Sequence, residues 1–146
     1  MLDNVKLRLV KAASAAGQTA VTSDPVDMAD YDAVLFFTTA GAITASAVTS
    51  IKVQQSSDSG GSPDTWADLL GTGVTIADDD DGQTFGIQII RPRERYLRLY
   101  VSRGTANSAF GEIYALQFGG DRLPIANTVT DLLTFESHES PAEGTA

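Results

Sequence analysis

The chain has 146 residues, no cysteine, a single histidine and a formal net charge of −9. That length accommodates one domain with a real core, and a hydrophobic content of 42% is typical of a globular chain. The composition excludes disulfide scaffolds, cysteine zinc sites and thiol nucleophiles, and the acidic charge argues against nucleic-acid and anionic membrane partners.

Alternation of apolar and polar residues, typical of half-buried strands, is the main local pattern of the chain. It recurs at residues 5–9, 51–54, 85–89, 96–101 and 113–118. Residues 34–39 are continuously apolar and rich in strand formers, which predicts a strand covered on both faces. Helical signals are weak, with at most one turn expected at 65–70 and at 131–135.

Turn-rich stretches rich in Gly, Ser and Asp separate these segments, at residues 56–63, 78–82 and 103–107. Short strands joined by such turns predict an all-β fold, an antiparallel β-sandwich or barrel, with a jelly-roll-like sandwich favoured. We expect a single domain over residues 1–133 and a flexible, polar and acidic tail over 134–146, ordered only against a neighbouring subunit. No stretch approaches the ~18 apolar residues of a membrane span, and the N-terminus lacks the apolar run of a signal peptide, so we expect synthesis in a cytoplasm.

The run Asp78, Asp79, Asp80, Asp81 and Gly82 is the most conspicuous acidic feature. Hard cations such as calcium take several carboxylate oxygens, so these four aspartates are weak metal candidates. Adjacent side chains do not all point inward, however, and the alternating spacing of an EF-hand loop is missing. We favour a solvated acidic hairpin loop between strands near 74–76 and 85–89.

Half of the ten Lys and Arg residues lie within positions 91–103. Pro92 places a turn or edge there, and alternation puts Arg98 on one strand face with Tyr96 and Tyr100. Arginine and tyrosine are enriched where proteins meet, so the segment is a candidate interface: Arg91, Arg93, Arg95, Tyr96, Arg98, Tyr100 and Arg103. Internal neutralisation of the acidic loop and of Glu112 across the sheet is the main alternative, and nucleic-acid stacking is a third.

Trp66 is the only tryptophan, and we expect it to be buried at one end of the core, with an exposed sugar-stacking platform as the alternative. The sequence contains no Gly-x-Ser-x-Gly elbow and no Gly-x-x-x-x-Gly-Lys loop. Its single histidine, His138, stands in the polar tail, which argues against a conventional Ser-His-Asp triad. We therefore expect no enzyme activity and no cofactor.

Two resemblances arise from these residues. The phrases at 51–58, 65–69 and 95–99 resemble strands of jelly-roll domains of the discoidin or carbohydrate-binding kind, although the cysteine pair common in secreted members is absent. A second resemblance covers residues 50–125 and is to small virion proteins of tailed bacteriophages that look like capsid decoration (cement) proteins. Its residues are Trp66, Gly82–Phe85, Pro92–Arg98, Val101–Asn107, Ala115–Phe118 and Arg122–Pro124.

The second resemblance implies a structural protein on the virion head surface. Its implied partners are the major capsid protein and sister copies, in a homotrimer, with no catalytic residue. Two other functions stay open at this point: a carbohydrate- or receptor-binding module of a fibre or tail, and a head–tail connector or tail component.

Overall fold

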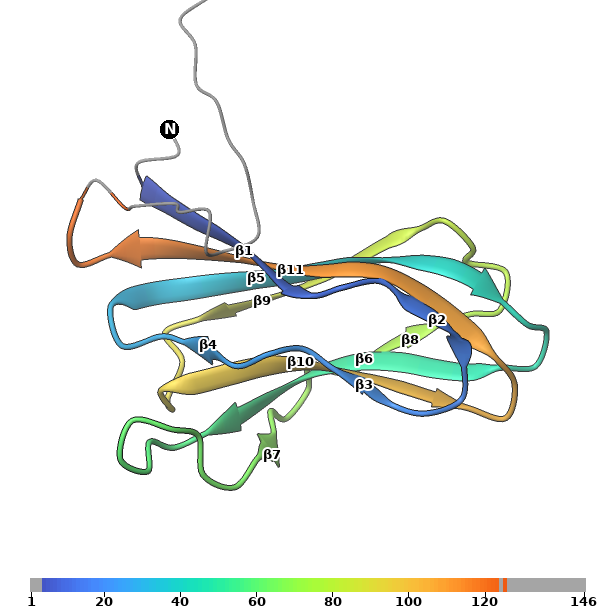
Figure 1. Ribbon diagram of the computed structural model, residues 1–146, viewed down its shortest axis with the longest axis horizontal. Helices are drawn as coiled ribbons and strands as arrows, with labels where there is room; N and C mark the ends of the chain where they lie inside the picture. The colour runs from blue at the N-terminus through green and yellow to red at the C-terminus, as the bar shows by residue number, and fades with distance from the viewer. Residues whose placement is uncertain (1–3, 124, 126–146) are drawn as a thin grey trace, which may run out of the picture.

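In the computed structural model, residues 4–123 and 125 are described, and they form an all-β sandwich of two antiparallel sheets (Figure 1). No helix long and apolar enough to cross a membrane occurs among these residues. The predicted tail at 134–146 and the predicted turn at 131–135 lie outside them. The strands are β1 (Val5–Lys11), β2 (Ser14–Gly17), β3 (Val21–Thr22), β4 (Val26–Asp27), β5 (Tyr31–Ile43), β6 (Val48–Ser56), β7 (Ala67–Asp68), β8 (Val74–Ile76), β9 (Thr84–Ile90), β10 (Tyr96–Gly104) and β11 (Ser108–Gly120).

Sheet A has the strand order β1-β11-β5-β9, and β2 also pairs with β11. Sheet B has the strand order β3-β10-β6-β7, in which β4 also pairs with β10 and β8 also pairs with β6. The short strands therefore combine in pairs, β1 with β2, β3 with β4, and β7 with β8, each pair on a single neighbour. The chain then passes between the sheets in the alternating order of a jelly roll, which confirms the predicted fold class.

The inner faces of the two sheets form one hydrophobic core. On β10, Leu97, Leu99 and Val101 are fully buried, and Ile51 and Val53 of the neighbouring β6 are buried with them. Sheet A contributes Val34, Phe36, Ile113 and Ala115, while Phe85 and Ile89 of β9 pack against the edge of this cluster. Because side chains alternate along every strand, burying these residues determines which residues point outward from each sheet.

The alternation in β1 is inverted relative to a strand whose apolar residues face the core. Arg8 pairs with the buried Ala115, so Lys6 and Arg8 lie on the inner side, whereas Leu7 and Leu9 lie on the outer side of sheet A. A register shift between Leu9 and Lys11 then turns Val10 inward, where it is 1% exposed. Periodicity alone detects a strand here but does not say which set of side chains is buried.

The prediction that residues 34–39 are covered on both faces is wrong for one face. Val34, Phe36 and Thr38 are buried against the core, but Leu35 and Phe37 on the opposite face are only half-buried. The two faces of this apolar run therefore lie in different environments: one packs in the core, and the other forms part of the outer surface of sheet A.

Core truncation gives a first test of this packing. Leu99 is fully buried, so Leu99→Ala is expected to lower the free energy of unfolding by about 2–5 kcal/mol through lost burial and a residual cavity. Leu70 is fully exposed, and Leu70→Ala is the matched control, with an expected change within about 0.5 kcal/mol. Urea unfolding followed by far-ultraviolet circular dichroism measures both, and equal losses would contradict the core assignment.

Candidate functional site on the outer face of sheet B

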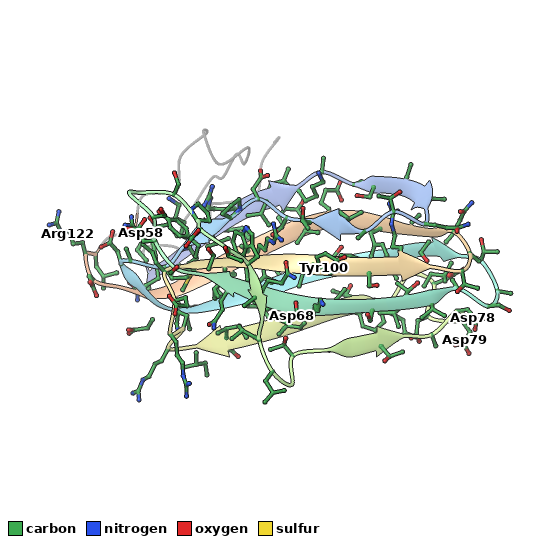
Figure 2. The ribbon with its side chains drawn as sticks, turned by 90° about the horizontal axis from the view of Figure 1, so that it is seen from below. Asp58, Asp68, Asp78, Asp79, Tyr100 and Arg122 are labelled. Atoms are coloured by element: carbon green, nitrogen blue, oxygen red, sulfur yellow. The ribbon has the colours of Figure 1, made fainter. Side chains whose placement is uncertain are left out.

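The outer face of sheet B carries a set of polar and aromatic side chains that we call the sheet B platform. Leu97, Leu99 and Val101 point into the core, so Arg98 and Tyr100 between them point away from it. Figure 2 views this side of the molecule and shows Tyr100 and Asp68 over the middle of the sheet. The platform consists of Lys52, Gln54, Trp66, Asp68, Arg98 and Tyr100.

Cross-strand register brings these side chains together, since Arg98 is opposite Gln54, Tyr100 is opposite Lys52, and Gln54 is opposite Asp68. The Nε of Arg98 donates to Oε1 of Gln54 at 2.8 Å. Gln54 donates in turn to Oδ1 of Asp68 at 2.8 Å, and Nζ of Lys52 donates to Oδ2 of the same carboxylate at 2.6 Å. Three strands are thereby linked by one continuous hydrogen-bonded chain on the solvent side.

Two cation–aromatic contacts complete the platform. The guanidinium of Arg98 lies 4.2 Å from the ring centre of Trp66, and the ammonium of Lys52 lies 4.9 Å from that of Tyr100. Burial lowers the pKa of Arg98, and the hydrogen bond from Lys52 lowers the pKa of Asp68. The arrangement presents flat aromatic and guanidinium surfaces beside hydrogen-bonding groups, a chemistry suited to recognising another surface or a polar ring.

The prediction that Trp66 is buried at one end of the core is wrong. Trp66 immediately precedes β7, is only partly buried, and lies against Arg98 outside the core cluster. The stack on Arg98 accounts for its partial burial, because a planar guanidinium covers the face of an indole well.

Arg95 is used inside the molecule. Its Nε and Nη2 donate to the two carboxylate oxygens of Asp27 at 2.9 and 2.7 Å, and Nη1 donates to Asp58 at 2.8 Å. This bidentate pair lowers the pKa of Asp27 and raises that of Arg95. Arg95 thus ties the β4 edge and the 57–63 loop to the start of β10.

Tyr96 and Arg103 also have structural roles within the chain. Tyr96 is 5% exposed, with the guanidinium of Arg95 5.2 Å from its ring centre, and desolvation raises its pKa. Arg103 donates to the main-chain oxygens of Thr19, Ala15 and Ser108 at 2.6, 2.8 and 2.8 Å. These bonds hold the segment between β2 and β3 beside the end of β10.

The structure therefore divides the seven predicted interface residues into three groups. Arg98 and Tyr100 belong to the platform, and Arg91 and Arg93 are exposed in the turn before β10. Arg95, Tyr96 and Arg103 make the internal contacts described above. The predicted partner Glu112 for this strand is wrong, because Glu112 lies on β11 in sheet A, whereas Arg98 lies on β10 in sheet B.

The acidic run Asp78–Asp81 lies between β8 and β9, as predicted, but it connects sheet B to sheet A and is not a hairpin. Asp78 accepts from the amide of Ser46, Asp81 accepts from that of Ile43, and Asp80 accepts from the amide of Ala77. Three of the carboxylates thus support the turns at this end of the sandwich, and in the described ranges no three acidic or histidine side chains group as metal ligands. Figure 2 shows Asp78 and Asp79 at the opposite end of the molecule from Asp58, the partner of Arg95.

Sequence reasoning missed Lys52, Gln54 and Asp68. The first two alternate with buried Ile51 and Val53, so their outward direction was readable, but their partners depended on the β10–β6 register. The short β7 that delivers Asp68 carries no strand pattern of its own.

Comparisons with known proteins agree with the fold. No family model matches the chain, and no curated protein matches it. Among solved structures, a structure of infectious bursal disease virus, Gt strain, matches with a TM-score of 0.52 and 8% identity over 82% of this chain. The chain spans only 34% of the length of that viral chain.

Two carbohydrate-binding structures also align with the chain. Chitosan-binding module 1 of a chitosanase/glucanase from Paenibacillus sp. IK-5 gives a TM-score of 0.40 and 25% identity, over 74% of each chain. A CBM4 structure gives a TM-score of 0.43 and 14% identity, over 81% of this chain and 88% of that one. The jelly-roll-like sandwich itself is defined by the strand order.

Substitution of Trp66 tests its placement on the platform. Because Trp66 is partly buried and stacks on Arg98 outside the core, Trp66→Ala is expected to lower the free energy of unfolding by about 1–2 kcal/mol, compared with about 3–5 kcal/mol for a tryptophan in the core. A double-mutant cycle with Arg98→Ala, measured by chemical unfolding, isolates the stack, with an expected coupling of about 0.5–2 kcal/mol. A coupling of zero would contradict the stack.

The Asp27–Arg95 pair predicts a pH dependence. The folded-state pKa of Asp27 lies below its ordinary value of 3.8, so the pair stabilises the fold above that value and its contribution is lost as the pH falls through the folded-state pKa. Melting temperatures between pH 5 and pH 2 should therefore fall more steeply for the wild type than for Arg95→Gln, which starts lower. Parallel curves for the two proteins would contradict this assignment.

Proposed function

We propose that the protein is a non-catalytic structural protein of a bacteriophage virion, a capsid decoration (cement) protein that binds the outer head surface and stabilises the shell. The observation that carries the proposal is the sheet B platform, a preorganised aromatic and cationic surface on a rigid sandwich. It is supported by the resemblance of residues 50–125 to small phage head proteins. The viral likeness concerns the fold only.

The platform has the chemistry of a protein-binding surface. Trp, Tyr and Arg are the residues that most often dominate binding energy at interfaces, and Trp66, Tyr100 and Arg98 lie together on one sheet face. Lys52 of the platform is paired with Asp68, whereas Arg98 contacts an amide oxygen and an indole, so the charge of Arg98 suits an acidic group on a shell protein. The proposed partners are the major capsid protein and two sister copies in a homotrimer on the head surface of the virion.

Arg98 provides the test. Arg98→Ala should reduce binding of the purified protein to undecorated heads by at least about 10-fold, equivalent to about 1.4 kcal/mol, because its guanidinium is central to the platform. Lys11→Ala, an exposed cation at the end of β1, is the matched control and should bind normally. Co-sedimentation with heads measures binding, and thermal melting shows that each variant is folded. Unchanged binding by a folded Arg98→Ala protein would overturn the assigned surface, and absence of the protein from purified virions would overturn the function.

The partial exposure of Trp66 favours one second candidate, a carbohydrate- or receptor-binding module of a phage fibre or tail. An indole beside Gln54 and Asp68 offers both a stacking face and hydrogen-bonding groups for a sugar ring. Because Trp66 is the sole tryptophan, its fluorescence reports on this site directly. Saturable quenching or enhancement by oligosaccharides, abolished in Gln54→Ala, would support this candidate over decoration. A third assignment, a head–tail connector or tail component, predicts rings in native mass spectrometry in place of trimers.

A further inference from the structure

The outer face of sheet A presents three rows of residues that run across four strands. The registers of β1, β11, β5 and β9 align these rows, and on β5 and β11 their larger members are half-buried and alternate with buried core residues. Phe37 and Tyr114 stack with ring centres 5.4 Å apart, and Ile90 is 65% exposed. None of the twelve residues is charged. We call them the sheet A apolar face, and row by row they are Val5, Phe118, Ala33 and Ile90; Leu7, Leu116, Leu35 and Gln88; and Leu9, Tyr114, Phe37 and Gly86.

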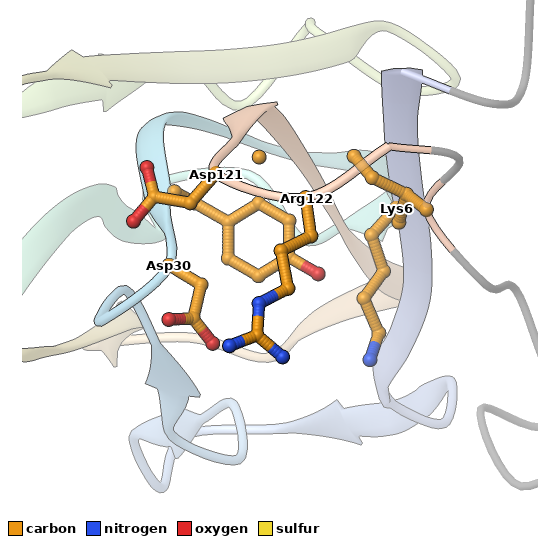
Figure 3. Close-up of a pocket in the computed structure, with 7 residues that line it drawn as sticks. Lys6, Asp30, Asp121 and Arg122 are labelled. Carbon is orange, nitrogen blue, oxygen red and sulfur yellow. The ribbon is translucent and has the colours of Figure 1, made fainter.

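The charged residues of β1 lie on the other side of the sheet from this face. Figure 3 shows Lys6 at a cavity of about 270 Å³ that Asp30, Asp121 and Arg122 also line. The opposite orientation of β1 would place its leucines toward the core and its cations toward water. The observed orientation instead adds apolar side chains to the outer face, which is favourable where a second apolar surface covers them.

The outer face of sheet A has the size of one side of a standard protein interface. β5 and β11 contribute 13 residues each, β9 contributes seven, and β1 and β2 add seven and four along one edge. At about 3.3 Å per residue and about 4.8 Å between strands, these strands cover roughly 700 Å². A standard interface takes about 800 Å² from each partner, with an apolar centre and a polar rim. Thr39 and Thr84, whose hydroxyls lie 3.1 Å apart, follow the last row and form such a rim.

The sheet A apolar face is complementary to a second copy of itself. A two-fold axis that runs along the strands, between two stacked sheets, places β11 of one copy on β5 of the other and β1 on β9. Phe118 then meets Ala33 of the second copy, so that a large side chain lies over a small one. In the third row Leu9 meets Gly86 in the same way. In the middle row, Leu116 meets Leu35.

We propose that the unbound protein forms a two-fold dimer through the sheet A apolar face. The face matches the area that a stable dimer needs, and it brings no like charges together at its centre although each copy carries a net charge of −9. Both sheet B platforms point outward in this dimer. The inference does not rest on the proposed function, and a homotrimer on the head surface would need a further contact.

Sedimentation velocity of the full-length protein from low to high micromolar concentration tests the dimer. We expect a concentration-dependent shift from monomer to dimer. Leu116→Glu places a carboxylate at the centre of the contact and should weaken dimerisation by at least about 100-fold. Leu70→Glu, at a fully exposed leucine outside the face, is the matched control and should dimerise like the wild type. A wild-type protein that stays monomeric, or a dimer that Leu116→Glu leaves intact, would overturn the proposal.

A charge pair tests the two-fold arrangement. Leu116→Glu and Leu35→Lys should each be monomeric alone, whereas their mixture should form heterodimers, because the carboxylate of one copy then lies opposite the ammonium of the other. Added salt should strengthen the wild-type dimer severalfold, since it screens the repulsion between two acidic copies. Failure of the mixture to associate, or a wild-type dimer that salt dissociates, would contradict a contact through this face.

Folding of the variants is checked by circular dichroism. Gln88→Lys changes an exposed member of the same face, opposite Leu7 of the second copy, and serves if Leu116→Glu does not fold. It should weaken the dimer by about 10-fold, because the ammonium is removed from water in the contact. Dimerisation of folded Gln88→Lys at the wild-type affinity would likewise overturn the proposal.

Discussion

Burial of the β10–β6 ladder is the constraint on which the rest of the molecule depends. Nine residue pairs join these strands, and on the inner side Leu97, Leu99 and Val101 meet Ile51 and Val53 without solvent exposure. Since side chains alternate, a slip of one residue would place Arg98 and Tyr100 in the core and the leucines in water. The free energy lost in that exchange strongly disfavours any other register of β10 on β6. The same register places Arg98 beside Gln54 and Tyr100 beside Lys52, so the core determines the platform.

The few cations of this acidic chain are used in two ways. Arg95 and Arg103 hold neighbouring segments to the two ends of β10, Arg95 through Asp27 and Asp58, and Arg103 through main-chain carbonyls. A planar guanidinium suits both tasks, because its donors reach several acceptors in one plane. Arg98, in the middle of the strand, has an amide oxygen and an indole as partners, and within the described part of the chain no carboxylate pairs with it. Its charge is therefore not neutralised within the platform in the way that Asp27 and Asp58 neutralise Arg95, and it is available to an acidic partner.

The sequence predicts the fold class and the strands well, because alternation and turn residues are local signals. It does not predict which face of β1 is buried, since Val5, Leu7 and Leu9 alternate with Lys6 and Arg8 in the same way whichever side the core lies on. The error at Trp66 has a similar origin: a lone tryptophan is most often buried, but its place here depends on Arg98, which lies far away in the chain. The interface prediction placed the candidate residues on and just before β10, but it could not distinguish the outward-facing Arg98 and Tyr100 from Arg95 and Arg103, which bind other segments of the chain. Asp58, which holds Arg95, is 37 positions away and is brought close only by the folded 57–63 loop.

The two outer faces of the sandwich differ in how strongly their side chains are ordered before a partner binds. On the sheet B platform, hydrogen bonds and ring contacts already restrict the rotamers of Arg98, Gln54 and Lys52. Immobilising such long side chains otherwise costs about 0.5–1.5 kcal/mol each on association, so a preordered network binds with less entropy loss. The outer face of sheet A, with Leu35, Phe37, Tyr114 and Leu116, is mainly apolar, and such a surface stabilises a complex through burial with little directional preference. A surface of the first kind suits recognition of one specific partner, whereas a surface of the second kind suits permanent coverage. This difference is the physical reason for assigning partner binding to sheet B.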